Sequence, residues 1–180
     1  MGHLPVGAFL NKRLRIIGID PGTVVTGYGI IEETETGVNY SVIDYGCIRP
    51  PKELLLSDRY LVLSNGVEHL LEKFHPDALV VETQFVRKNV QSAIKLGMAR
   101  GITLIAAKKR GIPVFEYAPA RAKQAATGNG QASKEQVQGM IRMLFKLGES
   151  PLPEDAADAL ALALCHANMI KFQSILEAQI

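Results

Sequence analysis

The stretch IIGIDPGTVVTGYGII, residues 16–31, places an acid at the end of an aliphatic run and directly before a Pro-Gly turn. The apolar residues on both sides predict two strands of a hairpin whose tip lies near residues 24–26. Asp20 is then the last residue of a buried strand. Its carboxylate either accepts hydrogen bonds from local backbone N–H groups, as Asp does in turns, or is a metal ligand that needs further carboxylates at the same place.

Length and composition predict one folded domain. The chain has 180 residues, of which 47% are hydrophobic and 21% charged, and this composition excludes a disordered chain. The formal net charge is only +2, so a nucleic-acid-binding surface requires local clustering of basic residues. We expect a single domain over residues 14–172, a loose N-terminal extension over residues 1–13 and a C-terminal tail over residues 173–180.

The signals for a cellular compartment favour the cytoplasm. Cys47 and Cys165 are far apart, lie in apolar surroundings and form no CxxC pair, which favours reduced thiols over a disulfide or a zinc site. No apolar run reaches the roughly 18 residues that a membrane span needs. The opening residues lack the charged region of a signal peptide. We therefore expect a cytoplasmic protein with no membrane partner.

The order of strand and helix patterns predicts an α/β fold. Runs rich in β-branched residues predict strands, and apolar residues at helical spacing predict helices. The expected strands are residues 14–20, 27–33, 40–48, 77–83 and 113–118, and the expected helices are residues 56–74, 89–111, 134–147 and 153–170. The first three strands are expected to be antiparallel and the later ones parallel, because helices separate them. We expect a mixed sheet with helices on both faces.

Local signals support several ends of these elements. Ser57 is a plausible N-cap for the first helix, and Gly111 closes the second. Ser133 and Gln136 have the spacing of a capping box. Pro153 stands at the start of the final helix, which is apolar nearly all round, as expected for a helix in the core. The glycines of TGNGQASK, residues 127–134, do not have Walker A spacing, so a phosphate loop of that type is excluded.

Four acids fall at positions where they can meet. Glu82 ends an apolar strand as Asp20 does, and Asp155 and Asp158 are three residues apart in the first turn of the final helix, on one face. Each acid alone has a simpler explanation, as a strand exit or as a favourable charge at a helix start. Together, four buried carboxylates without a cation cost several kcal/mol. They converge only if the final helix packs beside the first and fourth strands.

Four consecutive motifs carry a resemblance to a known family. They are GIDPGTVVTGYGII (18–31), VVETQFVRKNVQSAIKLGMARG (80–101), PVFEYAPARAKQAATGNGQASKEQVQGMI (113–141) and DAADALALALCHA (155–167). In this order, from about residue 14 to about residue 170, the sequence resembles the RuvC family, the bacterial Holliday junction resolvases. The resemblance implies a ribonuclease H-like fold, a homodimer, magnesium, cleavage of four-way DNA junctions, and the branch-migration proteins RuvA and RuvB as partners.

The resemblance also implies roles for the four acids. By matching motifs, Asp20, Glu82, Asp155 and Asp158 take the positions of the family's metal-binding carboxylates, although some relatives carry His at the position of Asp155. Phosphodiester hydrolysis needs an activated water and a stabilised leaving oxygen, and two divalent ions about 4 Å apart provide both. Oxygen ligands favour Mg²⁺ or Mn²⁺ over zinc. We expect two Mg²⁺ per active site, with Mn²⁺ able to substitute, and Asp20 between them.

The other three acids can be assigned to the two ions, and His166 can be excluded from the site. Glu82 and Asp158 are expected to complete the shell of one ion and Asp155 that of the other. His166 stands eleven residues beyond Asp155, roughly 16 Å along the same helix at 1.5 Å per residue, so it cannot share the site. We expect it to be a core or surface histidine.

Basic and aromatic residues near the acids are candidates for DNA contact. In ETQFVRKN, residues 82–89, Phe85 lies just beyond a strand in a polar stretch, where it is either a core residue or, as the resemblance favours, a wedge between unstacked bases. The basic candidates follow that strand or flank the glycine-rich segment: Arg87, Lys88, Arg121, Lys123 and Lys134. Lys123 and Lys134 are expected to contact phosphates, because the family motifs carry basic residues there. Lys108, Lys109 and Arg110 fit an ordinary solvated surface better.

Two other functions deserve comparison with a junction nuclease. GIDPGT, residues 18–23, also resembles the phosphate-binding hairpin of the actin, Hsp70 and sugar-kinase superfamily, but those enzymes need two such domains and 180 residues do not hold them. The second alternative is a protein that binds junctions without cleaving them. The presence of all four acids favours an enzyme.

Overall fold

The structure is a computed structural model that describes residues 13–37, 39–83 and 90–177. This part of the chain holds five strands and five helices, in the order that the sequence predicted and with one additional helix. The elements are β1 (Arg15–Asp20), β2 (Thr26–Glu33), β3 (Tyr40–Ile48), α1 (Leu56–Phe74), β4 (Ala78–Glu82), α2 (Val90–Lys109), β5 (Val114–Tyr117), α3 (Pro119–Thr127), α4 (Lys134–Leu144) and α5 (Glu154–Glu177).

The strands form one mixed sheet in the order β3-β2-β1-β4-β5. β1, β2 and β3 are antiparallel neighbours, whereas β4 and β5 run parallel to β1. The carboxyl ends of parallel strands lie at the same edge of a sheet, so the ends of β1, β4 and β5 lie together. The predicted mixed sheet is confirmed, and its parallel half brings Asp20 and Glu82 to one edge.

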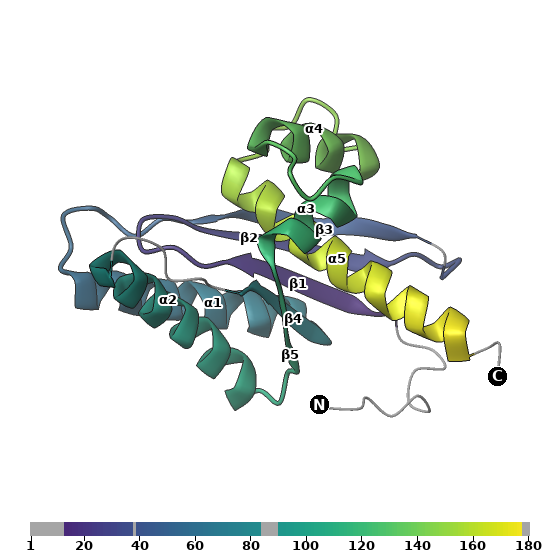
Figure 1. Ribbon diagram of the computed structural model, residues 1–180. Coiled ribbons are helices and arrows are strands. Elements are labelled where there is room, and N and C mark those ends of the chain that lie inside the picture. The colour runs from purple at the N-terminus through teal and green to yellow at the C-terminus, as the bar shows by residue number, and fades with distance from the viewer. Residues whose placement is uncertain (1–12, 38, 84–89, 178–180) are drawn as a thin grey trace.

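Alternating side chains divide the core between the two faces of the sheet. Ile16, Ile31 and Val80 point to the face covered by α3, α4 and α5. Ile17 and Leu79, one residue away in their strands, point to the face covered by α1 and α2. Figure 1 shows α5 crossing one face and α1 and α2 lying against the other. Both faces are buried, which explains why β1 and β4 are continuously apolar.

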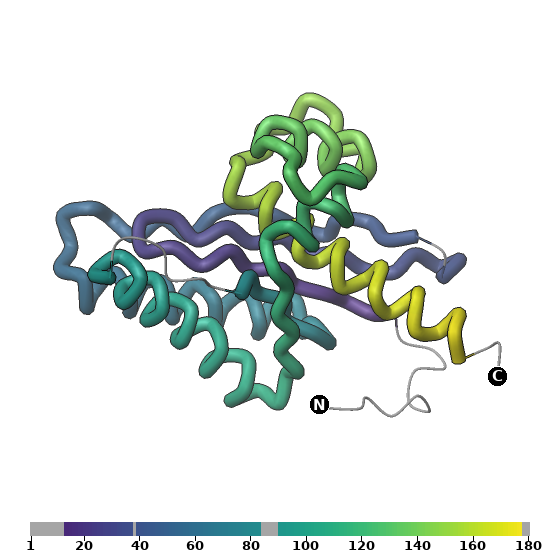
Figure 2. Tube along the Cα trace, viewed as in Figure 1, coloured from purple at the N-terminus to yellow at the C-terminus, as the bar shows by residue number. Residues whose placement is uncertain are grey.

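α5 approaches the sheet closely because glycines lie beneath it. A Cβ atom at Gly18 would lie 1.9 Å from the Ala159 carbonyl oxygen, and one at Gly29 would lie 2.5 Å from Leu160 Cγ. Side chains at residues 18 and 29 would therefore push the helix away. Figure 2 shows the path of α5 across the strands, with its first turns next to α3 and α4.

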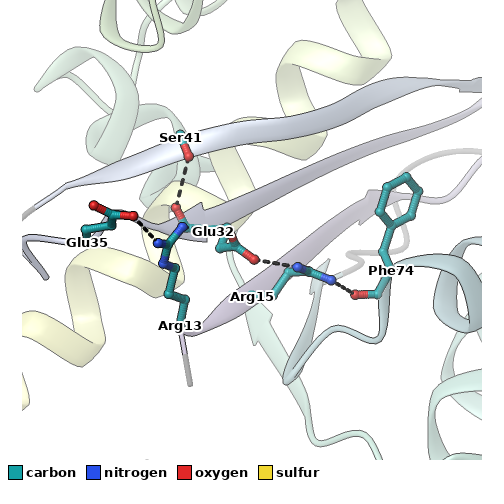
Figure 3. Close-up of polar contacts among 6 residues, drawn as sticks. All are labelled: Arg13, Arg15, Glu32, Glu35, Ser41 and Phe74. Atoms are coloured by element: carbon teal, nitrogen blue, oxygen red, sulfur yellow. Dashed lines mark hydrogen bonds and ion pairs between the residues drawn. The ribbon is translucent and has the colours of Figure 1, made fainter. Parts of the chain in front are cut away.

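The start of β1 is fixed by polar contacts to three elements. The Arg15 guanidinium donates hydrogen bonds to Glu32 of β2 and to the Phe74 carbonyl at the end of α1 (Figure 3). The Arg15 backbone N–H donates to Asp77 Oδ2 at 2.9 Å, just before β4. Arg13 forms an ion pair with Glu35 on the strand connection. These contacts hold the end of β1 that lies opposite Asp20.

Several details differ from the expectations. The N-cap prediction for Ser57 is wrong: Leu55 is the N-cap, with an extended backbone, and Ser57 lies inside the first turn. The Ser133–Gln136 capping box is confirmed. α3 was not predicted, because its sequence PARAKQAAT is short and buries only alanines, Ala122 and Ala126, in place of larger apolar residues. α5 runs without a break to Glu177, and the division into extension, domain and tail stays a prediction.

α5 is long and apolar enough to cross a membrane when judged by length and composition alone. Ten of its residues are buried within the protein, however, and they pack against the sheet and the neighbouring helices. The core helix of a globular protein passes the same test. The apolar character of α5 is therefore accounted for by its position between the sheet and α3 and α4.

Candidate active site

Two acids stand side by side where β1 and β4 end. The last register pair of these parallel strands is Ile19 with Val81, and Asp20 and Glu82 are the next residues of each strand. Because side chains alternate, both carboxylates point to the same face as Val80, which is the face covered by α5. Both side chains are partly buried. The two strand ends thus form the first half of an acidic site.

The turn after Asp20 is held by other residues. The Gly22 N–H donates to Thr26 Oγ1 at 3.0 Å, and the Thr26 hydroxyl donates to the Gly22 carbonyl at 2.8 Å. Arg59 of α1 donates to the Thr23 carbonyl. Among the described residues, none donates a hydrogen bond to the Asp20 carboxylate. Its position is therefore not explained by a role in the turn, and the other interpretation, a ligand, remains.

The second half of the site comes from the start of α5. Gly27 pairs with Asp20 across the hairpin, and a Cβ atom at Gly27 would lie 2.0 Å from the Asp155 carbonyl oxygen and 2.8 Å from Asp155 Cβ. Asp155 therefore stands over the residue next to Asp20. Asp158 follows one turn later on the same side of the helix. Convergence of the acids requires that the final helix packs beside the first and fourth strands. The structure shows this packing, because α5 contacts both β1 and β4.

The electrostatics show that the four acids act on one another. Burial, followed by the charges of Asp158, Glu82 and Asp155 in that order, raises the pKa of Asp20 from 3.8 to about 7, and the charge of Lys134 acts in the opposite direction. Burial also raises the pKa of Glu82 and of Asp158 above their ordinary values, and the charge of Asp158 adds to the effect at Glu82. A group of partly buried carboxylates that repel one another is stabilised by a cation among them.

Lys134 supplies positive charge to this group. Its Nζ lies 3.8 Å from Asp158 Oδ2 and 3.7 Å from Glu154 Oε2. Burial acts to lower the pKa of Lys134, but the charges of Asp158, Glu154, Asp155 and Asp20 outweigh it and the pKa is raised. The Lys134 ammonium group thus lies in the negative electrostatic field that would also attract a bound cation.

The arrangement fits a hard divalent cation by its chemistry, although it is not a closed cage. The donors are carboxylate oxygens only, the type that Mg²⁺ and Mn²⁺ prefer. Within residues 13–37, 39–83 and 90–177, no three His, Cys, Asp or Glu side chains lie close enough to hold one ion as they are placed. The carboxylates would therefore have to rotate toward a common point to share one ion.

The basic candidates lie in different surroundings. Lys123 of α3 donates from Nζ to the Ala132 carbonyl at 2.8 Å, and its charge lowers the pKa of Glu82 against the stronger effect of burial. Arg121 is exposed and its charge acts on Tyr117, at the end of β5. The predictions for Phe85, Arg87 and Lys88 lie outside the described residues.

Sequence reasoning missed other residues beside the acids. Glu154 shares Lys134 with Asp158. Cys47 of β3 pairs with Gly27 in register and so stands in the same row across the sheet; burial raises its pKa, and the nearby charge of Asp155 contributes. Neither residue has a distinctive motif. Glu154 adjoins Asp155 in the sequence, and its ion pair with Lys134 depends on the position of α4, whereas the register of β2 with β3 brings Cys47 to the site.

Comparison with known proteins places the chain in a family. The family model described as crossover junction endodeoxyribonuclease RuvC matches residues 16–166. The chain belongs to the RuvC family. The resemblance of the four motifs to the RuvC family is thereby confirmed. This family, and not the actin, Hsp70 and sugar-kinase superfamily, accounts for the GIDPGT motif.

RuvC-family relatives resemble the chain over most of its length. The crossover junction endodeoxyribonuclease RuvC of Protochlamydia amoebophila is 59% identical over 160 residues, which is 89% of this chain and 94% of the relative. That of Ruminiclostridium cellulolyticum is 44% identical over 161 residues, or 89% and 96% of the two chains.

A solved RuvC structure has the same architecture. Thermus thermophilus RuvC, in a complex with a Holliday junction substrate, superposes with a TM-score of 0.80 at 34% identity and covers 89% of this chain and 96% of that one. The predicted ribonuclease H-like α/β fold is confirmed. This RuvC-family chain is accordingly a relative of nucleases, in line with the predicted enzyme class.

Proposed function

We propose that the chain is a structure-specific endonuclease that resolves four-way DNA junctions by paired symmetric nicks, in a reaction dependent on Mg²⁺. One observation carries the proposal beyond family membership: Asp155 stands over Gly27, the register partner of Asp20, while Glu82 ends the neighbouring strand. A set of oxygen donors at one sheet edge, in a chain of the RuvC family, supports hydrolysis of phosphodiesters.

Asp20, Glu82, Asp155 and Asp158 are the proposed catalytic, metal-binding residues. When two Mg²⁺ or Mn²⁺ ions are bound, they supply an activated water and a stabilised leaving oxygen. Asp20 is central to the group and lies between Glu82 and the acids of α5, so it is the proposed shared ligand. Glu82 and Asp158 then serve one ion and Asp155 the other. Burial around Asp20 limits competing water and strengthens its interaction with a cation.

Basic residues around the acids are the proposed phosphate contacts. Lys134 and Lys123 both act electrostatically on the acids, so a phosphate that approaches the acids also approaches these two ammonium groups. Arg121, Arg87 and Lys88 are proposed to extend this surface. Phe85 is proposed to wedge into unstacked bases at the junction centre.

A homodimer is the proposed assembly, and the exposed face of α2 supports it. Val90, Ile94 and Met98 follow one another at helical spacing, and each is more than half exposed. Gly97 and Gly101 on the same helix have open space where a Cβ would be, so a second backbone can approach closely. An apolar row of this kind on a globular protein indicates an interaction surface. Two copies would present two acidic sites to a two-fold symmetric junction.

The proposed location is the cytoplasm, with RuvA and RuvB as partners by family relationship. Reduced thiols at Cys47 and Cys165 fit a reducing compartment. Within the described residues, the one helix both long and apolar enough to span a membrane, α5, is a core element.

Junction cleavage with and without free divalent ions tests the proposal. Purified protein is incubated with a four-way junction labelled on one strand at a time, first in Mg²⁺ and then in EDTA. The proposal expects paired nicks at symmetric positions in two opposed strands, only in Mg²⁺. Junction binding without nicks in either buffer would instead support the alternative of a junction-binding protein without catalysis. Linear duplex DNA of the same sequences is the matched control and is expected to stay intact.

A further inference from the structure

The edge strand β5 lies directly beside Glu82. Tyr117, its last residue, pairs with Glu82 in register, and the Thr83 N–H donates to the Tyr117 carbonyl at 2.9 Å. β5 has only four residues and is paired on one side only. A short edge strand needs contacts outside the sheet to fix its end.

His166 of α5 provides such a contact from above the sheet. Its side chain is 3% exposed. Nδ1 lies 2.8 Å from the Tyr117 hydroxyl, and the ring stacks on Phe115 with centroids 4.0 Å apart. Nε2 is buried without a hydrogen-bond partner among the described residues. Among the described residues, the bond to Tyr117 is therefore the one hydrogen bond of this buried ring, and of the two expected alternatives, a core or a surface histidine, the structure shows a core one.

We propose that the hydrogen bond between Tyr117 and His166 positions Glu82 and the start of α3 relative to α5. His166 sits on the helix that carries Asp155 and Asp158, whereas Tyr117 sits beside Glu82. The bond therefore ties the strand half of the acidic site to its helix half. The inference rests on the proposed function and adds two positioning residues to it.

The place of Tyr117 in the chain extends this effect to the DNA contacts. Ala118 follows it as the N-cap of α3, and α3 carries Lys123, whose Nζ holds the Ala132 carbonyl. A shift of the end of β5 moves both its strand neighbour Glu82 and the first turn of α3. On the opposite face, Glu116 is held by an ion pair with Arg100 of α2, so β5 is held from two sides and only the Tyr117 side faces the acids.

The hydrogen bond is expected to be independent of pH in the ordinary range. Burial lowers the pKa of His166 to about 4 and raises that of Tyr117 to about 12. Arg121 and Cys165 are the charged or titratable groups that act on Tyr117. With these pKa values both partners are neutral between about pH 4 and about pH 12, so neither gains nor loses the proton of the hydrogen bond in that range. Loss of the hydrogen bond should change the reaction by a similar factor at pH 6 and at pH 9.

A double-mutant cycle tests the pair. Tyr117→Phe keeps the ring and removes the hydroxyl, and His166→Leu removes the nitrogen partner. Each is expected to slow single-turnover cleavage by about 5-fold with the junction Kd within 2-fold, a rate factor typical of one neutral hydrogen bond. The double variant is expected to be no slower than either single one. His166→Asn keeps a polar atom near Nδ1 and should restore most of the rate. Tyr45→Phe, on the same face of the sheet at β3, is the control without effect.

Two measurements separate this inference from the proposed function. Tyr117→Phe is expected to weaken Mn²⁺ binding by about 3-fold, measured by the loss of the electron paramagnetic resonance signal of free Mn²⁺. It is also expected to shift the His166 Nδ1 resonance in NMR spectra. Wild-type protein that binds Mn²⁺ but cuts no junction would overturn the proposed function and leave these two readouts to decide the pair. Wild-type cleavage with unchanged rates and Mn²⁺ affinity in Tyr117→Phe would overturn the inference, as would a lower melting temperature alone.

Discussion

Gly27 lies so close to Asp155 that a Cβ atom at residue 27 would be 2.0 Å from the Asp155 carbonyl oxygen. Backbone occupies that space, so no side-chain rotation relieves the clash. The absence of a side chain at residue 27 is thus what allows an acid of α5 to stand beside Asp20.

Gly27→Ala should therefore displace the start of α5. We expect a loss of about 1–3 kcal/mol in the free energy of unfolding, as for overpacked cores, and a loss of cleavage larger than the loss of junction affinity. Gly139→Ala is the matched control: it lies within α4 with open space around it and should gain about 0.5–1 kcal/mol. Denaturant unfolding and junction cleavage measure both. Equal stability of Gly27→Ala and wild type would contradict the close packing.

The raised pKa of Asp20 predicts a pH dependence of stability in EDTA. Its folded pKa of about 7 lies above the ordinary 3.8, so between these values the folded state holds a proton that the unfolded state has lost. The free energy of unfolding should then fall as the pH rises from about 4 to about 7, by at most about 4 kcal/mol.

Asp20→Asn should reduce that slope to the part contributed by Glu82 and Asp158, whose pKa values are also raised, and should be more stable than wild type at pH 7 in EDTA. Added Mg²⁺ should raise the melting temperature of the wild type more than that of the variant, because the ion binds the folded state only. Glu149→Gln, in an exposed connection, is the control and should follow the wild type. Parallel pH profiles for wild type and Asp20→Asn would show that Asp20 ionises normally.

The two lysines near the acids should differ in their effects. Lys134→Ala is expected to weaken junction binding and to flatten its dependence on salt by about one unit of log-log slope. Lys123→Ala should do the same and also lower the melting temperature, because its Nζ holds the Ala132 carbonyl. Lys109→Ala, at the exposed end of α2, is the control. A salt slope that Lys134→Ala leaves unchanged would assign Lys134 to the ordinary surface.

The fold was predictable because the signals were local. Aliphatic runs gave β1 and β4, and the strand ends placed Asp20 and Glu82 together once the strands were parallel neighbours. The packing of α5 was not readable in detail, since it depends on glycines of β1 and β2 that face the helix. Cys47 and Tyr117 lie near the acids only through the register of their strands, and no local pattern marks either one.

The proposed homodimer predicts the number of nicks. One chain offers one acidic site, so a dimer of wild-type and Asp20→Asn chains should cut one strand only. On a supercoiled plasmid with an extruded cruciform, such mixed dimers should give nicked circles, whereas wild-type dimers should give linear product. Linear product from purified mixed dimers without subunit exchange would rule out one site per strand.

Cleavage by the four acid variants, with junction affinity measured in the same samples, tests most directly whether these carboxylates form the active site. Asp20→Asn, Glu82→Gln and Asp158→Asn should abolish cleavage in Mg²⁺ while the junction Kd stays within a few fold. Asp155→His should be milder, because imidazole retains a metal ligand. Glu149→Gln should cleave as the wild type does. If Asp20→Asn resolves junctions at the wild-type rate, the acids of β1, β4 and α5 do not form the active site.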